Sequence, residues 1–172
     1  MTGILTTERL ALREMVPADL DFVADMLADP EVMRYYPKTY SRSEAQEWLD
    51  RQRTRYLRDG HALWLVSSRA SGEAVGQIGV VRQTVRGVDY AEVGYLLARA
   101  FWGQGLATEA ARACRDHAFQ ALGRAQVISL IRPENLPSCR VAERMDMKVV
   151  DRVPHWGYDH LVYAISRQEV GS

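Results

Sequence analysis

The sequence contains little cysteine, no surplus of either charge and no long hydrophobic segment. Its only cysteines, Cys114 and Cys139, have no metal-ligand or disulfide-framework spacing, so we expect two buried thiols in a reducing compartment. Lys and Arg (22) balance Asp and Glu (22), whereas nucleic-acid-binding proteins usually carry a basic surplus, so nucleic acid is not an expected partner. The longest apolar segments, such as residues 61–68, are far shorter than the roughly 18 residues of a membrane span. Early charged residues also argue against a signal peptide, so we expect a cytoplasmic protein without membrane contact.

What is present is the composition of an ordinary globular domain. Hydrophobic residues make up 47% of the chain and charged residues 26%, which excludes disordered and fibrous classes. A length of 172 residues corresponds to one domain, since domains average roughly 150 residues. Neither a repeat nor a linker-like segment interrupts the chain. We therefore predict a single domain over residues 1–172.

Hydrophobic periodicity predicts an alternation of strands and helices. The predicted strands are residues 4–15, 61–69, Ala74–Val85, 88–98, 125–131, 147–153 and 159–165, and the predicted helices begin at Pro17, at Ser41 or Ser43, at Leu106 and at Asn135, with a further helical turn at residues 31–35. Some strands are joined by helices and others by hairpin turns. This order predicts an α/β fold with a mixed, mostly antiparallel sheet of about seven strands and about four helices.

The most informative segment is a loop with two glycines that joins the third hairpin strand to a helix. It reads Trp102-Gly103-Gln104-Gly105-Leu106-Ala107-Thr108. Small residues let the backbone approach a ligand, and the N–H groups at a helix start bind anions such as a pyrophosphate. Leu106-Ala107 stands where a nucleotide triphosphatase needs Lys-Ser/Thr, and a dinucleotide fold would place this loop after its first strand. The loop therefore predicts another kind of anion site, with a ligand-free tight turn as the alternative.

This segment resembles the GNAT superfamily of acyl-CoA-dependent N-acyltransferases, specifically its RimJ/RimL-like branch. In that family the loop and helix hold the acetyl-CoA pyrophosphate, and Trp102 takes the place of an Arg or Gln, as is usual in this branch. Gly105 and Ala107 take the small positions. Asn135-Leu-Pro-Ser138 is similar to the family's Asn-x-x-Ser/Ala, and the opening Thr7-Glu8-Arg9-Leu10 looks like the start of this branch. The resemblance covers about residues 5–166 and implies a GNAT fold with acetyl-CoA as cosubstrate.

Two positions depart from the family pattern. Ala142 replaces a frequent tyrosine, so a tyrosine general acid cannot act from there. Asp146-Met147 replaces a Gly-Phe pair at the end of the same helix, and Asp146 can adopt the left-handed conformation that glycine takes without strain. We expect the Met147 change to alter core packing and leave the chemistry untouched.

Acyl transfer to an amine needs a base, an oxyanion site and an acid for the thiolate. Glu92, between apolar neighbours on the strand before the loop, is the candidate base; a solvated or ion-paired carboxylate is the alternative. Ser138 is the candidate acid and Asn135 the candidate pantetheine contact, with helix capping as the alternative for both. Backbone N–H groups near Tyr95 are implied oxyanion donors. The complete cofactor-binding prediction is Tyr95, Leu96, Leu97, Trp102, Gly103, Gln104, Gly105, Leu106, Ala107, Thr108, Asn135 and Ser138.

The acceptor amine is expected to lie between two aromatic segments. The resemblance places Tyr35 and Tyr36 on one wall and His155 and Trp156 on the other, although exposed or core aromatics would give the same pattern. Arg51, Arg55 and Arg58 share a face of the second helix that is either solvated or docks an anion. No His, Cys, Asp or Glu residues have metal-ligand spacing, so we expect no metal.

The function predicted from this set is acetyl transfer from acetyl-CoA to a primary amine in a ternary complex. The resemblance suggests a protein N-terminal amine as acceptor. A small-molecule amine, a longer donor such as succinyl-CoA, and a catalytically silent acyl-CoA sensor are the alternatives. The chain is expected to be a monomer or a homodimer.

Overall fold

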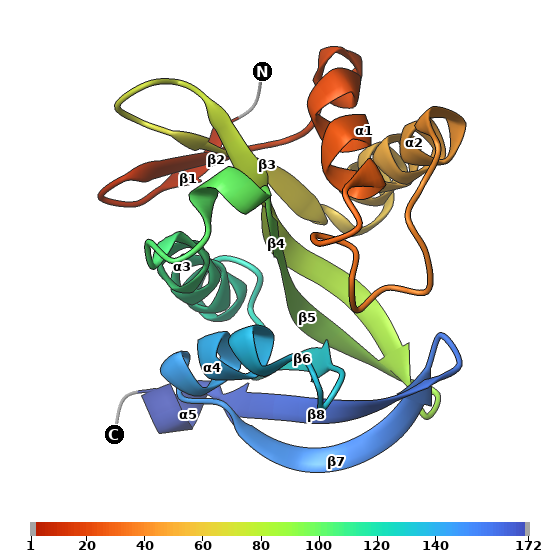
Figure 1. Cartoon of the computed structure of the whole chain (residues 1–172). Helices are drawn as coiled ribbons and strands as arrows, with labels where there is room; N and C mark the ends of the chain where they lie inside the picture. The colour runs from red at the N-terminus through yellow and green to blue at the C-terminus, as the bar shows by residue number, and fades with distance from the viewer. Residues whose placement is uncertain (1–2, 171–172) are drawn as a thin grey trace.

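One mixed β-sheet runs through the molecule in the order β1-β2-β3-β4-β5-β6-β8-β7 (Figure 1). This computed structural model describes residues 3–170. The strands are β1 (Gly3–Thr6), β2 (Leu10–Arg13), β3 (Leu63–Ser68), β4 (Ala74–Val85), β5 (Val88–Leu97), β6 (Gln126–Ile131), β7 (Lys148–His155) and β8 (Tyr158–Ser166). All neighbouring strands are antiparallel except β5 and β6. The predicted α/β architecture with a mixed, mostly antiparallel sheet is confirmed.

The described sheet has eight strands rather than about seven because residues 4–15 form two strands instead of one. The Thr7 backbone N–H donates to the Leu10 carbonyl at 2.8 Å and closes a tight turn. β1 and β2 pair antiparallel on either side of it. The four residues between the apolar parts of the two strands, 6–9, are polar but include no Gly, Pro, Asn or Asp, so the usual turn signal that would reveal the reversal of the chain is missing.

Helices cover both faces of the sheet, with α1 and α2 on one side and α3 and α4 on the other (Figure 1). Their bounds are α1 (Leu20–Ala28), α2 (Arg42–Asp59), α3 (Leu106–Gln120), α4 (Leu136–Arg144) and the short α5 (Arg167–Val170). α5 is additional to the four predicted helices. The predicted helical turn at residues 31–35 forms hydrogen-bonded turns without a helix.

Local signals set the ends of these helices. Ser41 caps α2, accepting from the Glu44 N–H while the Glu44 side chain accepts from the Ser41 N–H, and Gly60 ends the helix at φ 83°. Asp146 follows α4 at φ 64°, which confirms the left-handed conformation expected there.

Cys114 and Cys139 are both free and buried, which agrees with the prediction.

Buried polar side chains fix α2 on the sheet. Trp48 Nε1 donates to Gln77 Oε1 of β4 at 2.8 Å, and the Leu63 N–H donates to Gln52. The Tyr56 hydroxyl accepts from the Met15 N–H at 3.1 Å and donates to the Leu63 carbonyl. These bonds satisfy backbone groups at Leu63, where β3 begins, and at Met15 after β2, and they set the position of α2 along the strands.

Replacing Tyr56 by phenylalanine is expected to lower the free energy of unfolding by about 1–3 kcal/mol, because two buried backbone groups lose their partner. Urea denaturation followed by circular dichroism measures the change. Tyr158→Phe is the matched control, since Tyr158 is exposed and its hydroxyl bonds to no residue of 3–170. Equal effects of the two variants would contradict the assigned role of Tyr56.

Candidate active site

The sheet opens between β5 and β6. The two parallel strands pair only at Ala91 with Val127 and at Glu92 with Ile128. Beyond these pairs, β5 remains paired with β4 up to Leu97, whereas β6 pairs with β8. We call the region beyond Glu92, where β5 and β6 no longer pair, the split.

Two side chains replace backbone hydrogen bonds where the split begins. The buried Ser129 hydroxyl donates to the Val93 carbonyl at 2.7 Å, and the Leu130 N–H donates to the Glu92 carboxylate at 3.0 Å. Backbone groups of adjacent strands normally bond to each other. Here side chains satisfy them, which allows the strands to diverge without leaving these polar groups unpaired.

Alternation along β5 assigns its residues to two sides. The Val93 carbonyl points toward β6, because it accepts from a β6 side chain. Alternate residues of a strand direct their N–H and C=O groups to the same neighbour, so Tyr95 and Leu97 also direct theirs toward the split. By the same rule the Leu96 N–H points toward β4. No described residue of β6 pairs with Tyr95 or Leu97, and the Trp102 side chain bonds to Leu97, so Tyr95 is the one of the three predicted residues whose backbone faces the split without a bound loop side chain.

The glycine loop leads into α3 as the sequence predicts. Gly103 (φ 75°) and Gly105 (φ 77°) both adopt the left-handed conformation, and Gly105 is the N-cap of α3. No side chain caps this helix start, so the N–H groups of its first turn remain available for an anion. Trp102 is half exposed, and its Nε1 donates to the Leu97 carbonyl at 2.9 Å, which ties the loop to the end of β5.

The turn between β1 and β2 contacts the glycine loop through the side chain of Arg9. The Arg9 guanidinium donates to the Gln104 carbonyl at 2.9 Å and to the Glu109 carboxylate at 2.8 Å. Burial raises the pKa of Glu109, but hydrogen bonds from Thr7 and Arg9 outweigh this effect and lower the pKa. Arg9 therefore positions the loop. Sequence reasoning noted Arg9 only as part of an opening motif, because about a hundred residues separate it from its partners.

The start of α4 lies on the same face of the sheet as the glycine loop and α3. Asn135 Oδ1 accepts from the Ser138 N–H at 3.3 Å, which confirms its interpretation as an N-cap. The Tyr95 hydroxyl donates to the Ser138 carbonyl at 2.6 Å and connects β5 to α4. The partly buried Ser138 hydroxyl forms no hydrogen bond with any residue of the described chain. The prediction assigns Tyr95 only a backbone role. Its side-chain hydrogen bond could not be predicted from local sequence, because Ser138 lies 43 residues further along the chain.

Glu92 lies on the opposite face, toward α2. Gln83 Nε2 donates to its carboxylate at 3.1 Å, in addition to the Leu130 N–H. Burial raises the pKa of Glu92 more than these two hydrogen bonds and the positive charge of Arg55 lower it. Glu92 is partly buried and forms no ion pair within residues 3–170, which argues against both alternative interpretations. Such a carboxylate is suited to accept a proton.

Aromatic rings from two segments meet on this same face. Tyr36 lies 5.6 Å from Trp156 and 6.3 Å from Trp48, measured between ring centroids. His155 stacks on Trp156 at 4.4 Å and contacts His160 at 5.1 Å. Burial and the positive charge of His160 lower the pKa of His155. Burial raises the pKa of Tyr36, and the negative charge of Glu92 adds to this effect.

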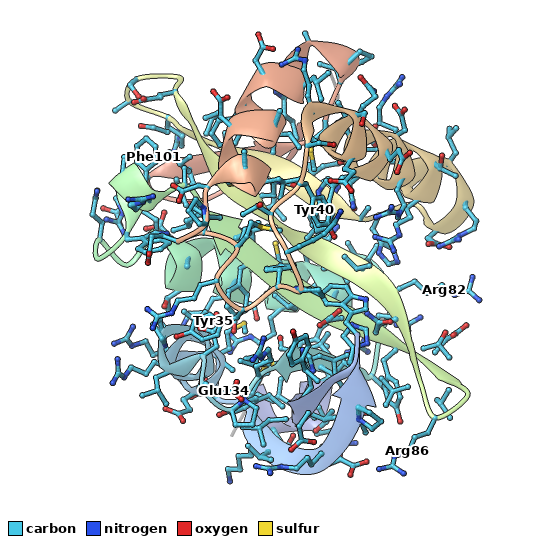
Figure 2. All side chains as sticks on the ribbon, turned by 45° about the vertical axis from the view of Figure 1, so that its right-hand side comes forward. Tyr35, Tyr40, Arg82, Arg86, Phe101 and Glu134 are labelled. Carbon is cyan, nitrogen blue, oxygen red and sulfur yellow. The ribbon has the colours of Figure 1, made fainter. Side chains whose placement is uncertain are left out.

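The structure thus brings three of the four predicted acceptor residues, Tyr36, His155 and Trp156, into one aromatic cluster. Tyr35 has no ring contact with this cluster and instead lies under the guanidinium of Arg34 at 5.7 Å. Figure 2 shows Tyr35 and Tyr40 on the segment between α1 and α2, which passes in front of the sheet.

Residues 3–170 contain neither a candidate membrane span nor a candidate metal centre. No helix there is long and apolar enough to cross a membrane. No three His, Cys, Asp or Glu side chains within residues 3–170 are placed to hold a metal ion.

Comparison with known proteins places this geometry in context. Residues 9–148 match the family model described as an acetyltransferase (GNAT) domain. The uncharacterized protein YkkB of Bacillus subtilis is 35% identical over 160 residues, which cover 92% of this chain and 93% of YkkB. An acetyltransferase from Agrobacterium tumefaciens superposes with a TM-score of 0.84 at 30% identity, covering 97% of this chain and 95% of the other. Mycobacterium smegmatis RimJ, solved with CoA-disulfide, has the same fold at 20% identity (TM-score 0.77, 95% and 84% covered).

Proposed function

Since the chain belongs to the GNAT family of acyl-CoA-dependent N-acetyltransferases, we propose that it transfers the acetyl group of acetyl-CoA to a protein N-terminal α-amine. The observation that carries this proposal is the two-sided arrangement of the split. Glu92 faces one side, the free Ser138 hydroxyl lies on the other, and the Tyr95 N–H points between them. A base, an acid and an oxyanion donor thus surround one opening.

The residues around the glycine loop fit the anionic part of acetyl-CoA. Gly103 and Gly105 leave the helix start uncovered, and a Cβ added at Gly103 would meet no atom within 4 Å. The first turn of α3 exposes the N–H groups of Leu106, Ala107 and Thr108, and the helix dipole favours negative charge there. When bound there, acetyl-CoA supplies an activated acetyl thioester.

Each protein group has one task in the proposed reaction. Glu92 accepts the proton of the acceptor ammonium, and burial favours its protonated form once the proton has moved. The Tyr95 N–H stabilises the negative charge that develops on the acetyl oxygen. As the C–N bond forms, the C–S bond of the thioester would break, with the Ser138 hydroxyl donating a hydrogen bond to the leaving sulfur. The second proton of the amine nitrogen would pass to that sulfur, so that the products are the acetylated amine and the free thiol of CoA.

The acceptor approaches from the face of α1 and α2. The aromatic cluster of Tyr36, Trp156 and His155 lies on that face beside Glu92 and offers apolar surface to a chain end. Fold and family alone do not distinguish a protein N-terminus from a small amine, because specificity depends on the site. A small-molecule amine, or succinyl-CoA as donor, remains the competing proposal.

The function is tested by thiol release from acetyl-CoA across small amines and peptides that begin with Ala, Ser or Lys. We expect release with peptide α-amines, with the acetyl group found on the N-terminus by mass spectrometry. Release only with small amines would replace the N-terminal acceptor by the small-amine alternative. Silence across the panel, with acetyl-CoA still bound in calorimetry, would contradict the proposed acceptor classes.

A further inference from the structure

Arg55 on α2 is a partly buried cation that no carboxylate of residues 3–170 bonds directly. Its guanidinium forms no hydrogen bond or ion pair with any residue of 3–170, whereas Arg58, one turn later, is paired with Asp59. Burial lowers the pKa of Arg55, and the positive charges of Arg51 and Arg58 lower it further, while the negative charges of Asp59 and Glu92 only partly offset these effects. An unpaired cation out of full contact with water is costly unless a ligand supplies the counter-charge.

Two hydrogen bonds between α2 and β4 indicate which part of the sheet Arg55 faces. Trp48 bonds to Gln77 of β4, and eleven residues later Asp59 bonds to Arg82 of the same strand. At about 1.5 Å per helical residue and about 3.4 Å per strand residue, these two paths have nearly equal length, so α2 runs along β4. Arg55 follows Trp48 by two helical turns and therefore lies on the same helix face, about 10 Å further along α2.

That distance corresponds to about three strand residues and brings Arg55 level with Val80 of β4. Val80 faces the other side of the sheet and residue 79 is glycine, so the nearest β4 side chain on the α2 face is that of Val81. Val81 is the direct cross-strand partner of Glu92 in β5. Gln77 faces α2, and alternation places Val81, and with it Glu92, on the same side of the sheet. Arg55 and Glu92 thus face the same region, and within the described residues they form no ion pair with each other.

We propose that Arg55 binds a carboxylate of the acceptor, so that the substrate is an amine with a carboxylate within a few bonds of its nitrogen. This inference rests on the proposed function, because the amine must lie beside Glu92. Arg55 lies on the α2 face of the sheet, whereas the glycine loop, Ser138 and the Tyr95 side chain lie on the face of α3 and α4. Arg55 therefore contacts the acceptor and not the acetyl donor. Asp59, the nearest other carboxylate on α2, is engaged by Arg58 and Arg82.

Two sources of this chemistry are distinguished by matched acceptor pairs. The peptide pair is Ala-Asp-Phe-amide and Ala-Asn-Phe-amide, and the small-molecule pair is L-alanine and L-alaninamide. We expect wild-type kcat/KM to favour the acidic member of one pair, which identifies the source. Arg55→Gln should reduce that preference about tenfold, the effect of losing one charge-assisted hydrogen bond. Arg53→Gln, an exposed charge change on the same helix, should leave it intact.

Two results of these assays would overturn the proposal. An equal loss for acidic and neutral acceptors in Arg55→Gln would mean that Arg55 acts on Glu92 alone. A change in the ratio of succinyl-CoA to acetyl-CoA use, with acceptor preference unchanged, would place the anion on the donor.

A binding measurement separates this inference from the proposed function. Calorimetry compares N-acetylaspartate with N-acetylasparagine on the complex of the protein with CoA. Tighter binding of N-acetylaspartate that Arg55→Gln abolishes and Arg53→Gln keeps would support the carboxylate site even if no acceptor in the panel were acetylated. Binding that is independent of Arg55 would overturn the inference while leaving acetyl transfer in place.

Discussion

Replacing Glu92 by glutamine should lower kcat/KM for the amine about 10²- to 10⁴-fold, the usual effect of losing a general base. Acetyl-CoA affinity should stay within about twofold, because Glu92 and the glycine loop lie on different sides of the split. Steady-state kinetics and calorimetry with acetyl-CoA measure the two quantities. Glu73→Gln, in the exposed turn before β4, is the charge-matched control.

The pH profile provides a second test of the same residue. Burial raises the folded-state pKa of Glu92, and the base works only when ionised, so wild-type kcat/KM should rise with pH through that raised pKa. Glu92→Gln should lose this limb and keep only the titration of the acceptor amine. Full activity with an unchanged profile would exclude Glu92 as the base and direct attention to His155.

Unfolding does not account for the expected loss. A raised folded-state pKa in a carboxylate means that its stabilising contribution is complete below the unfolded pKa and is lost as pH rises through the folded pKa. At neutral pH the ionised Glu92 therefore opposes folding, and the neutral glutamine should leave stability equal or higher. Urea denaturation of both proteins at pH 7 checks this expectation.

Substituting valine for Gly105 should weaken acetyl-CoA binding about 100-fold. Gly105 is the N-cap of α3 at φ 77°, a conformation that is strained for a β-branched residue, and relaxation would move the N–H groups that bind the anion. Loss of one charge-assisted hydrogen bond accounts for about tenfold, so displacement of two N–H groups of the first turn accounts for a change of about 100-fold. Calorimetry with CoA measures the affinity.

Gly72→Val separates this effect from backbone strain alone. Gly72 lies in the β3–β4 turn at φ 74°, and a Cβ there would meet nothing within 4 Å. Both variants should lose about 1–3 kcal/mol of stability, but only Gly105→Val should lose affinity. Similar CoA affinity in the two proteins would show that the glycine loop is a tight turn and not an anion site.

Local sequence was sufficient for most of the elements and for the glycine loop before α3. Alternating and helical periodicities depend on neighbours a few residues apart, so β4, α2 and α3 could be placed without a structure. The left-handed conformations at Gly105 and Asp146 follow equally from local sterics. The first strand was the exception, because the polar residues 6–9 between β1 and β2 include none of the Gly, Pro, Asn or Asp residues that usually mark a turn.

By itself, then, the sequence determined the α/β class, the loop before α3 and its resemblance to the GNAT family. Only the tertiary structure decided how the site is assembled. It sets where β5 and β6 diverge, the hydrogen bond from Arg9 to the glycine loop, the hydrogen bond from Tyr95 to Ser138 and the position of Arg55 along β4. The reason is physical. Periodicity and turn preferences are local energies, whereas strand divergence, burial of a carboxylate and the height of one helix on a sheet arise from contacts between residues far apart in the chain.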